Sequence, residues 1–339
     1  MVLDTLTSQY REALEEDMRA MVQEAECPER DLFLMLHYHL GWVDATFEPC
    51  TARSGKRVRP KLCLLSCEGC GGVWTEAIPA ATAIELLHNF SLIHDDIEDG
   101  DELRRGRPTI WSIWGEAQAI NAGDTLFALS QLALLRLAER GVAPGVIVDA
   151  ARLFNETCVA LTTGQYLDIA FEKDHRVSVD EYLTMITGKT AALLACSCEL
   201  GALVAEAPVP QREHVRSFGL HLGLAFQLLD DVLGIWGDEA LTGKPVGADI
   251  ARRKKTLPII HGLERSGVLR DLMAGQRLSD EEVQRARRVL EEAGSRHYTQ
   301  CLARVHHDAA LEELEQASLH PRATEALNQL SQKLLNRRR

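Results

Sequence analysis

The chain has 339 residues, of which 46% are hydrophobic and only 5% aromatic, and its formal net charge is −13. This length allows one large domain or two average ones. With so few aromatic residues, a buried core must be built mainly from Leu, Ala, Ile and Val, which favours helix over sheet. The acidic balance argues against general nucleic-acid binding, because that activity needs a dense basic surface.

The hydrophobic periodicity is helical throughout, and no segment has the period-two alternation of a strand. In chain order the pattern predicts helices over residues 3–24, 32–47, 61–70, 75–99, 121–140, 146–171, 178–205, 213–235 and 280–293, with a helical tail from residue 297. The sequence therefore predicts a single all-α domain over residues 1–339, a bundle of ten or more helices.

Local signals fix some of these boundaries. Ser178 with Glu181 has the spacing of a capping box, as has Ser279 with Glu282, so a helix is expected to begin at each pair. Prolines at positions 208 and 210 are expected to break the chain between two helices.

The strongest functional signal is the segment HDDIED at residues 94–99, which closes an apolar helical stretch over residues 83–93. Asp95 and Asp99 lie four positions apart and share a helix face, and Asp96 lies about 100° round the axis from Asp95. Three carboxylates at the C-terminal end of a helix repel one another and oppose the helix dipole, so a cation is expected to offset that cost. Hard oxygen ligands suit Mg²⁺, which commonly bridges carboxylates to phosphates. Taken alone, the segment is equally compatible with a solvated acidic helix end.

A second acidic pair, Asp230 and Asp231, closes the apolar stretch over residues 220–229. Two aspartate pairs, each ending its own apolar helix, suggest two walls of one metal site whose ions bind a diphosphate. Arg and Lys suit the fixed cations of such a site through bidentate and point-charge contacts to phosphate. The chain offers them in GKRVRP (55–60), RRGR (104–107), Lys189, Lys244 and RRKK (252–255), although each of these alone could be a solvated face.

Together these segments resemble, in order, the motifs of the trans-isoprenyl diphosphate synthases, the polyprenyl synthetase family. The resemblance runs from about residue 55 to residue 258 and includes GKRVRP (55–60), ELLHNFSLIHDDIED (85–99), RRGRPT (104–109), NAGD (121–124), GQYLD (164–168), GKTAALL (188–194), FQLLDDVLGIWGD (226–238) and GKPVGADIARRKKTLP (243–258). Each segment alone is modestly specific, whereas all of them in order are highly specific. The resemblance implies the isoprenoid synthase type I fold, with helices around a central cavity. It also implies the condensation of isopentenyl diphosphate with dimethylallyl, geranyl or farnesyl diphosphate.

The resemblance also implies residue roles. Asp95, Asp96 and Asp99 match the first aspartate-rich motif, which holds Mg²⁺ on the allylic diphosphate, and Asp230 and Asp231 match the start of the second, with three Mg²⁺ ions per active site. The isopentenyl diphosphate pocket corresponds to Lys56, Arg59, His88 and Arg105. Contacts to the allylic diphosphate correspond to Arg104, Lys189, Lys244 and Lys254. Thr190 and Gln227 match polar groups near the developing cation and, with Lys189 and Arg104, form the expected catalytic set.

One position departs from the family pattern. The second motif usually reads Asp-Asp-x-x-Asp, and here its fifth position is Gly234. Because Asp230 is retained, we expect weakened or rearranged binding of one ion rather than loss of activity. Asp238 is expected at most as an outer-shell residue.

Product length is expected to depend on the residues just before the first motif, which in this family form the floor of an apolar tunnel. Phe90 and Ser91 lie five and four positions before Asp95, and Leu87 lies one turn earlier. One aromatic residue with a small neighbour resembles geranylgeranyl (C20) diphosphate synthases, with C15 or C25 products as the alternatives. Phe90 could also be simple core packing.

Two other functions stay open at this stage. A terpene cyclase or a head-to-head condensing enzyme also carries aspartate-rich clusters, but it needs no isopentenyl diphosphate pocket. A non-catalytic partner subunit should have lost aspartates from the first motif, and this chain keeps all of them.

The remaining expectations concern assembly and location. The family is usually homodimeric, so a homodimer is expected by resemblance. The N-terminal residues lack a basic-then-apolar pattern and no stretch is long enough for stable membrane insertion, so a cytoplasmic location is expected. The nine cysteines are irregularly spaced, which fits a reduced compartment. Cys63, Cys67 and Cys70 have a spacing that could hold an iron–sulfur cluster, but small buried core residues are the preferred interpretation.

Overall fold

The computed structural model describes residues 2–25, 30–50, 55–173, 176–238, 246–274 and 278–335. The chain forms two compact units. Unit 1 comprises Met1–Leu153, Ser197–Val209 and Leu319–Ala326, and unit 2 comprises Phe154–Cys196, Pro210–Ser318 and Leu327–Arg339. The predicted single domain over residues 1–339 stays a prediction.

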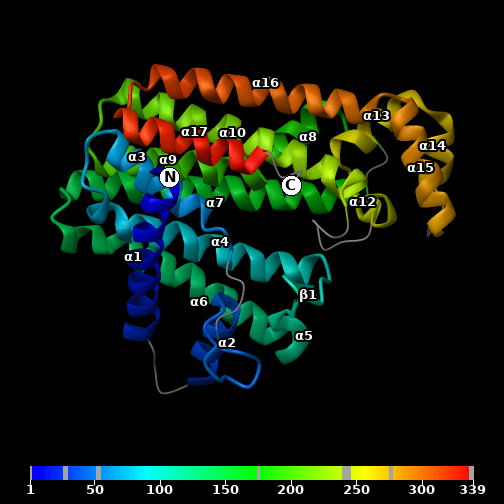
Figure 1. Cartoon of the computed structure of the whole chain (residues 1–339). Helices are drawn as coiled ribbons and strands as arrows, with labels where there is room; N and C mark the ends of the chain where they lie inside the picture. Colours follow the sequence, from blue (N-terminus) through cyan, green and yellow to red (C-terminus); the bar gives the residue numbers. More distant parts are fainter. Residues whose placement is uncertain are drawn as a thin grey trace. The chain divides into compact units, whose positions relative to one another are not determined.

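The predicted all-α class is confirmed, because nearly all of the regular structure in the described residues is helical (Figure 1). Unit 1 contains α1 (Val2–Glu24), α2 (Arg30–Leu40), α3 (Val58–Gly69), η1 (Trp74–Ala77), α4 (Ile78–Glu98), the strands β1 (Leu103–Arg104) and β2 (Arg107–Pro108), α5 (Ile110–Trp114), α6 (Glu116–Leu135) and η2 (Arg136–Arg140). Unit 2 contains α8 (Val179–Ile186), η3 (Thr187–Ala191), α12 (Ala248–Ala251), α13 (Leu257–Arg265), α14 (Gly267–Ala274), α15 (Asp280–Glu292) and α16 (Ser295–Gln316). It also holds nearly all of α10 (Val209–Trp236), whereas α7 (Pro144–Lys173), α9 (Ala192–Val204) and α17 (Pro321–Leu335) contribute to both units.

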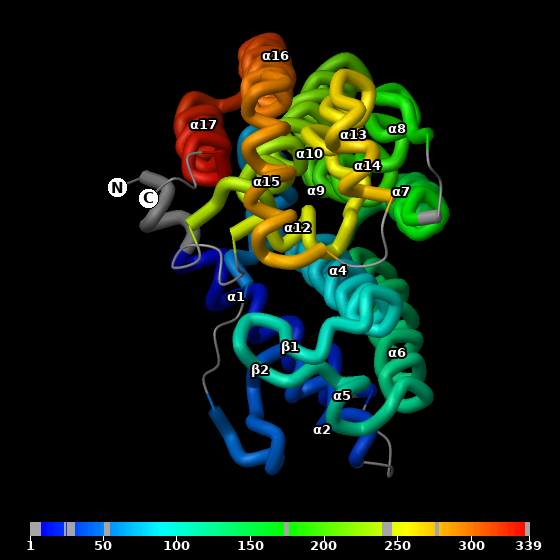
Figure 2. Tube along the Cα trace, turned by 90° about the vertical axis from the view of Figure 1, so that its right-hand side faces the viewer, coloured from blue at the N-terminus to red at the C-terminus, as the bar shows by residue number. Residues whose placement is uncertain are grey.

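Helix α4 is the core element of unit 1. Helix α6 runs beside it along most of its length, and α1 and α3 also pack on it (Figures 1 and 2). Ile84, Leu86 and Leu87 on α4 are completely buried. The acidic C-terminal end of α4 is therefore fixed by apolar packing along the preceding turns.

Helices α10 and α16 run antiparallel in unit 2. Gln211 donates to the carbonyl of Ala317, and His221 meets His306 at 3.0 Å between their Nδ1 atoms. Helix α10 is also the one helix of the described chain that is long and apolar enough to cross a membrane, but 56% of that apolar window is buried inside the protein. Its hydropathy is therefore that of a core helix.

The capping boxes and proline positions noted in the sequence can be compared with the observed helix ends. Both predicted capping boxes are present, at Ser178 with Glu181 and at Ser279 with Glu282. The predicted break at the two prolines is confirmed, because α9 ends at Val204 and α10 begins at Val209. Pro210 itself lies in the first turn of α10, where a missing N–H costs nothing. The predicted helical tail from residue 297 consists of two helices, α16 and α17, and Ser318 between them has a φ of 50°.

The cysteines support the structural interpretation made from the sequence. Cys63 and Cys67 are buried in α3, and burial, with Cys70 and Glu76 adding to it, raises the pKa of Cys67 to about 12. Burial also raises the pKa of Cys70 to about 11. The thiols of Cys67 and Cys70 are therefore protonated at neutral pH.

Candidate functional site

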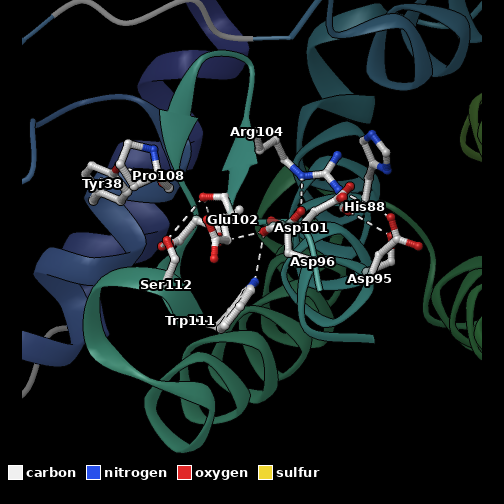
Figure 3. Close-up of polar contacts among 12 residues, drawn as sticks. Tyr38, His88, Asp95, Asp96, Asp101, Glu102, Arg104, Pro108, Trp111 and Ser112 are labelled. Atoms are coloured by element: carbon white, nitrogen blue, oxygen red, sulfur yellow. Dashed lines mark hydrogen bonds and ion pairs between the residues drawn. The ribbon is translucent and has the colours of Figure 1, made fainter. Parts of the chain in front are cut away.

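The acidic end of α4 is held by an arginine from the strand that follows it. Nε of Arg104 lies 2.7 Å from Oδ1 of Asp96, and Nη2 of Arg104 lies 3.3 Å from Oδ2 of Asp95 (Figure 3). Asp96 is buried, whereas Asp95 is partly exposed. Burial raises the pKa of Asp96 to about 6, with Asp95 and Asp101 adding to the rise and Arg104 opposing it. Asp99 ends the helix, and its N–H donates to the carbonyl of Asp95 at 2.9 Å.

Arg104 belongs to a short β-hairpin that sequence analysis did not predict. Strands β1 and β2 pair antiparallel around Arg105 and Gly106, whose φ values of 55° and 77° are both positive, as a type I′ turn requires. A non-glycine residue in this region costs about 1 kcal/mol. The surrounding contacts must therefore hold the turn in place.

Those contacts come from both sides of the hairpin (Figure 3). The hydroxyl of Tyr38 donates to the carbonyl of Pro108 at 2.7 Å. Nη2 of Arg107 donates to the carbonyl of Val43 at 2.8 Å. The indole N–H of Trp111 donates to the carbonyl of Asp101 at 2.9 Å. The hairpin is thus tied to α2, to the segment after α2 and to α5.

The basic side chains of unit 1 lie around two histidines, His88 and His39. Nε2 of His88 lies 3.1 Å from Nη1 of Arg59. Burial lowers the pKa of His88 well below its usual value, and the charges of Arg59 and Arg105 lower it further. Burial and the charges of Arg104 and Arg105 lower the pKa of His39, on α2, to about 3. Both imidazoles are therefore neutral at physiological pH, and the guanidinium groups around them supply the positive charge.

The loop before α3 reaches the same region. A Cβ on Gly55 would lie 2.8 Å from Nη2 of Arg105, so the loop backbone contacts that guanidinium directly. Lys56, the next residue, is exposed. Arg57 forms a buried ion pair with Glu85 on α4, at 2.6 Å, which fixes the start of α3. The predicted residues Arg59, His88, Arg104 and Arg105 are therefore brought together in unit 1.

The residues expected to set product length lie one turn further back on α4. The ring centroid of Phe90 lies 5.2 Å from that of Phe127 on α6 and 4.7 Å from that of His94. Leu87 is completely buried, and the hydroxyl of Ser91 donates to the carbonyl of His88 at 2.9 Å. Phe127 is thus an aromatic neighbour of Phe90 that the sequence did not single out.

Two of the predicted catalytic residues of unit 2, Lys189 and Thr190, lie in a π-helical turn, η3. A Cβ on Gly164 of α7 would lie 2.1 Å from the backbone nitrogen of Lys189, so only glycine allows the two backbones to touch there. Nζ of Lys189 lies 2.5 Å from Oδ2 of Asp168, one helical turn further along α7. The hydroxyl of Thr190 donates to Oε1 of Gln227 on α10 at 2.9 Å. Isolated π turns of this kind are frequent at functional sites.

Asp231 has a different environment from the one expected of a metal ligand. It is buried, and three donors use its two oxygens: the hydroxyl of Tyr182, the backbone N–H of Leu257 at 3.1 Å and Nε2 of Gln227 at 3.1 Å. Burial raises the pKa of Asp231 to about 7, with Asp249 adding to the rise and the three donors opposing it. Asp231 therefore ties α8, α10 and α13 together and orients Gln227 towards Thr190.

The other predicted residues of unit 2 are only partly placed. Asp230 and Asp238 are exposed, and Lys254 follows α12, where its N–H donates to the carbonyl of Asp249 at 3.0 Å. Lys244 lies outside the described residues.

The oxygen donors of unit 1 fit Mg²⁺ chemically. The end of α4 presents carboxylates, which Mg²⁺ prefers, and the guanidinium of Arg104 already lies against Asp95 and Asp96 as a positive charge. Within the described residues, no group of three His, Cys, Asp or Glu side chains is already arranged as a metal site.

Comparisons with known proteins agree with this chemistry. The polyprenyl synthetase family model matches residues 41–292. A geranylgeranyl diphosphate synthase of Mycobacterium tuberculosis is 43% identical over 295 residues, 86% of this chain and 83% of the relative. A (2E,6E)-farnesyl diphosphate synthase of Mycobacterium bovis is 40% identical over 311 residues, 89% of this chain and 85% of the relative. The crystal structure of a polyprenyl synthetase from Streptomyces coelicolor superposes with a TM-score of 0.89 at 38% identity, covering 98% of this chain and 99% of that one.

This chain therefore belongs to the polyprenyl synthetase family, which confirms the resemblance drawn from its motifs.

Sequence reasoning missed several residues of these two charged regions. His39, Phe127 and Asp168 were not singled out, although each contacts or surrounds a predicted residue. Asp168 is the last residue of the GQYLD segment, so the motif itself carried a signal for it. His39 and Phe127 belong to amphipathic helices without any local motif, and only the tertiary contacts identify them.

The environment of Asp231 predicts a pH-dependent effect of Tyr182→Phe. A hydrogen bond to an ionised group contributes about 1.5–3 kcal/mol and a neutral one about 1 kcal/mol. The folded-state pKa of Asp231 is about 7, so this carboxyl is ionised only above that pH. The variant should therefore lose more unfolding free energy at about pH 8.5 than at about pH 5.5, as urea titrations would measure.

Tyr298→Phe is the matched control. Its ring stacks on His261 at 4.2 Å between centroids, and the structure records no hydroxyl hydrogen bond for it among the described residues. Equal losses at the two pH values for Tyr182→Phe would contradict the assigned hydrogen bond to an ionisable Asp231.

Proposed function

We propose that this protein is a short-chain trans-isoprenyl diphosphate synthase that condenses isopentenyl diphosphate with an allylic diphosphate and makes mainly geranylgeranyl diphosphate. The observation that carries the proposal is the convergence of Arg59, Arg104 and Arg105 around His88, directly beside Asp95 and Asp96. A pocket of fixed cations next to an acidic helix end suits two diphosphates, one of them bound through a divalent cation.

In this proposal the residues of unit 1 hold the diphosphate groups. Lys56, Arg59, His88 and Arg105 bind isopentenyl diphosphate. His88 is neutral, so it can accept a hydrogen bond from Arg59 and keep that guanidinium oriented. Arg104 has a second task, because it neutralises Asp95 and Asp96 until a metal and a diphosphate arrive.

The residues of unit 2 are assigned to the allylic diphosphate and to the developing cation. We assign Lys189, Lys244 and Lys254 to the allylic diphosphate, and Asp168 holds Lys189 in place. The oxygens of Thr190 and Gln227 face the positive charge that develops when the allylic C–O bond breaks, and Asp231 fixes Gln227 through its amide nitrogen. The double bond of isopentenyl diphosphate then attacks, and the released diphosphate accepts the proton that is lost. No protein nucleophile is needed.

We assign Mg²⁺ to Asp95, Asp96 and Asp99 in unit 1 and to Asp230 in unit 2, with three ions per active site expected from the family. When bound, the ions supply positive charge to the leaving diphosphate. Asp231 is the exception among the predicted metal residues, because its hydrogen bonds favour a positioning role.

A homodimer and a cytoplasmic location complete the proposal. Helix α6 exposes Ile120, Leu132 and Leu135, with 44%, 49% and 53% of their surfaces accessible. Apolar side chains gathered on one helix suit a contact with a second copy of the chain. Light scattering should give about twice the chain mass of 37.6 kDa, and Leu132→Glu should shift the particle towards the monomer. A monomeric wild-type protein would contradict this part of the proposal.

The activity is tested with the purified chain, Mg²⁺, labelled isopentenyl diphosphate and, in turn, dimethylallyl, geranyl and farnesyl diphosphate. We expect elongation from each primer and a dominant C20 product by chromatography. Release of diphosphate without use of isopentenyl diphosphate would indicate a terpene cyclase. No reaction from the chain alone would indicate a partner subunit.

Product length is tested at Phe90. Removing this ring opens the space between α4 and α6, so Phe90→Ala should shift the main product to C25 or longer. Ser91→Phe adds an aromatic ring one position on and should shorten the product to C15. Phe127→Ala is the informative companion, since a floor shared by the two rings requires that it also lengthen the product. An unchanged C20 product from Phe90→Ala would leave Phe90 as core packing only.

A further inference from the structure

Arg57 stands at the start of α3 in a backbone conformation that a non-glycine residue rarely adopts. It is the N-cap of the helix, yet its φ of 49° and ψ of 47° are left-handed, and its side chain makes no capping hydrogen bond. An N-cap residue normally has an extended backbone, and the left-handed conformation costs free energy in a residue with a Cβ. Contacts of the Arg57 side chain must therefore stabilise this conformation, and such strained residues cluster at functional sites.

Two carboxylates from different helices hold the guanidinium of Arg57. Nη1 donates to Oε1 of Glu85 on α4 at 2.6 Å, and Nη2 donates to Oε2 of Glu15 on α1 at 3.4 Å. The side chains of Arg57 and Glu85 are only 4% and 5% exposed, whereas that of Glu15 is 31% exposed. Burial opposes the charge of Arg57, but the charges of Glu85 and Glu15 outweigh this effect, so the pKa of Arg57 is raised. The guanidinium is therefore a permanent cation whose position is set by α1 and α4.

Both carboxylates have further donors that fix their own positions. Nδ2 of Asn89 donates to the backbone carbonyl of Glu85 at 2.7 Å and to its Oε1 at 3.1 Å. The indole N–H of Trp42 donates to Oε1 of Glu15. The anchor of Arg57 is therefore a network that joins α1, α4 and the segment after α2.

This anchor lies directly beside the residues assigned to isopentenyl diphosphate. Lys56 precedes Arg57 in the chain, and Arg59 follows two positions later, with its Nη1 3.1 Å from Nε2 of His88. Glu85 and His88 are three positions apart on α4, so they lie on the same side of that helix. One side of α4 therefore receives both arginines of this segment, and the two contacts together fix the register of the segment on the helix.

We propose that Glu85 is a positioning residue for isopentenyl diphosphate. By holding Arg57, it fixes the cations at positions 56 and 59 in the arrangement that binds one diphosphate group. The inference rests on the proposed function, which assigns those two cations to isopentenyl diphosphate. Glu85 acts through Arg57 and not by direct contact, since its carboxylate is buried and a diphosphate is also an anion. The effect is confined to one substrate, because the allylic diphosphate is assigned to other residues.

The test measures kcat and the KM for each substrate in full-length variants, together with calorimetric binding of isopentenyl diphosphate. Glu85→Gln removes the charge and keeps the size of the side chain. It should raise the KM and the Kd for isopentenyl diphosphate by about 10-fold, whereas kcat and the KM for geranyl diphosphate should change by less than about 2-fold. Glu15→Gln is the milder variant, because Glu15 is more exposed and lies further from Arg57, and it should raise the same two constants by about 3-fold.

Asp17→Asn is the matched control. Asp17 is also a buried carboxylate of unit 1, and it accepts from the hydroxyl of Thr82 at 2.7 Å and lies 3.5 Å from Nη1 of Arg136. These partners belong to α4 and η2 and lie outside the segment 55–60. Loss of this charge should lower the melting temperature about as much as Glu85→Gln does, but it should change the affinity for isopentenyl diphosphate by less than about 2-fold.

A double-mutant cycle with Arg57→Met tests the pair itself. The losses of isopentenyl diphosphate affinity in Glu85→Gln and Arg57→Met should not add in the double variant, because each single change removes the same anchor. Circular dichroism of each variant checks that the helices are intact. If Glu85→Gln does not fold, Glu15→Gln decides, and an unchanged affinity in that variant counts against the inference.

An unchanged affinity for isopentenyl diphosphate in folded Glu85→Gln, an equal rise of both KM values, or the same loss of affinity in Asp17→Asn would overturn the inference. Product formation by wild type separates the two proposals. A wild type that makes prenyl product while Glu85→Gln binds isopentenyl diphosphate normally contradicts only the role of Glu85. A wild type that makes no product, but whose affinity for isopentenyl diphosphate falls in Glu85→Gln and not in Asp17→Asn, contradicts only the proposed function.

Discussion

The ion pair between Arg104 and Asp96 is the contact on which the organisation of unit 1 depends. It joins the C-terminal end of α4, which carries several carboxylates, to the β1–β2 hairpin, which carries several guanidinium groups. A buried carboxylate without a partner would cost several kcal/mol, by a rough general estimate, so the hairpin must hold its arginine firmly. The hydrogen bonds from Tyr38 and Trp111, together with those of Arg107, provide that support. Charges of both signs can then lie side by side and remain available to a diphosphate.

The two aspartate pairs of the chain show the same difference in burial between their two members. In each pair one carboxyl group is buried with a raised pKa, Asp96 on α4 and Asp231 on α10, and its neighbour is more exposed. Adjacent residues of a helix point about 100° apart, so one carboxyl group can be buried while its neighbour is more exposed. The buried member is fixed by donors from other elements. Two acidic residues that are adjacent in the sequence therefore need not both be metal ligands.

Much of the fold and part of the candidate site could be predicted from the sequence. Periodicity located the helices, and the reciprocal hydrogen bonds of Ser178 with Glu181 were predictable because both partners are local. The hairpin was missed because two residues per strand are too few to show alternation. The division of the helical tail at Ser318 carries no sequence signal, because a serine, rather than a glycine, takes the positive φ. The shared hydrogen bonds of Asp231 and the approach of Asp249 to Gly234 join residues far apart in sequence, so no local pattern contains them.

The π-helical turn η3 has a consequence for how this chain can vary. A π turn holds one residue more than the α-helical turn it replaces, and α8, η3 and α9 follow one another without a break. Deleting a single residue from η3 would restore a plain α-helical turn and leave the register of α9 nearly unchanged, because the π turn already absorbs the extra residue. The side chains within the turn would move instead, so Lys189 and Thr190 would lose their present positions beside Asp168 and Gln227. The extra residue of η3 therefore matters to the contacts made from the turn itself rather than to the packing of the helix that follows.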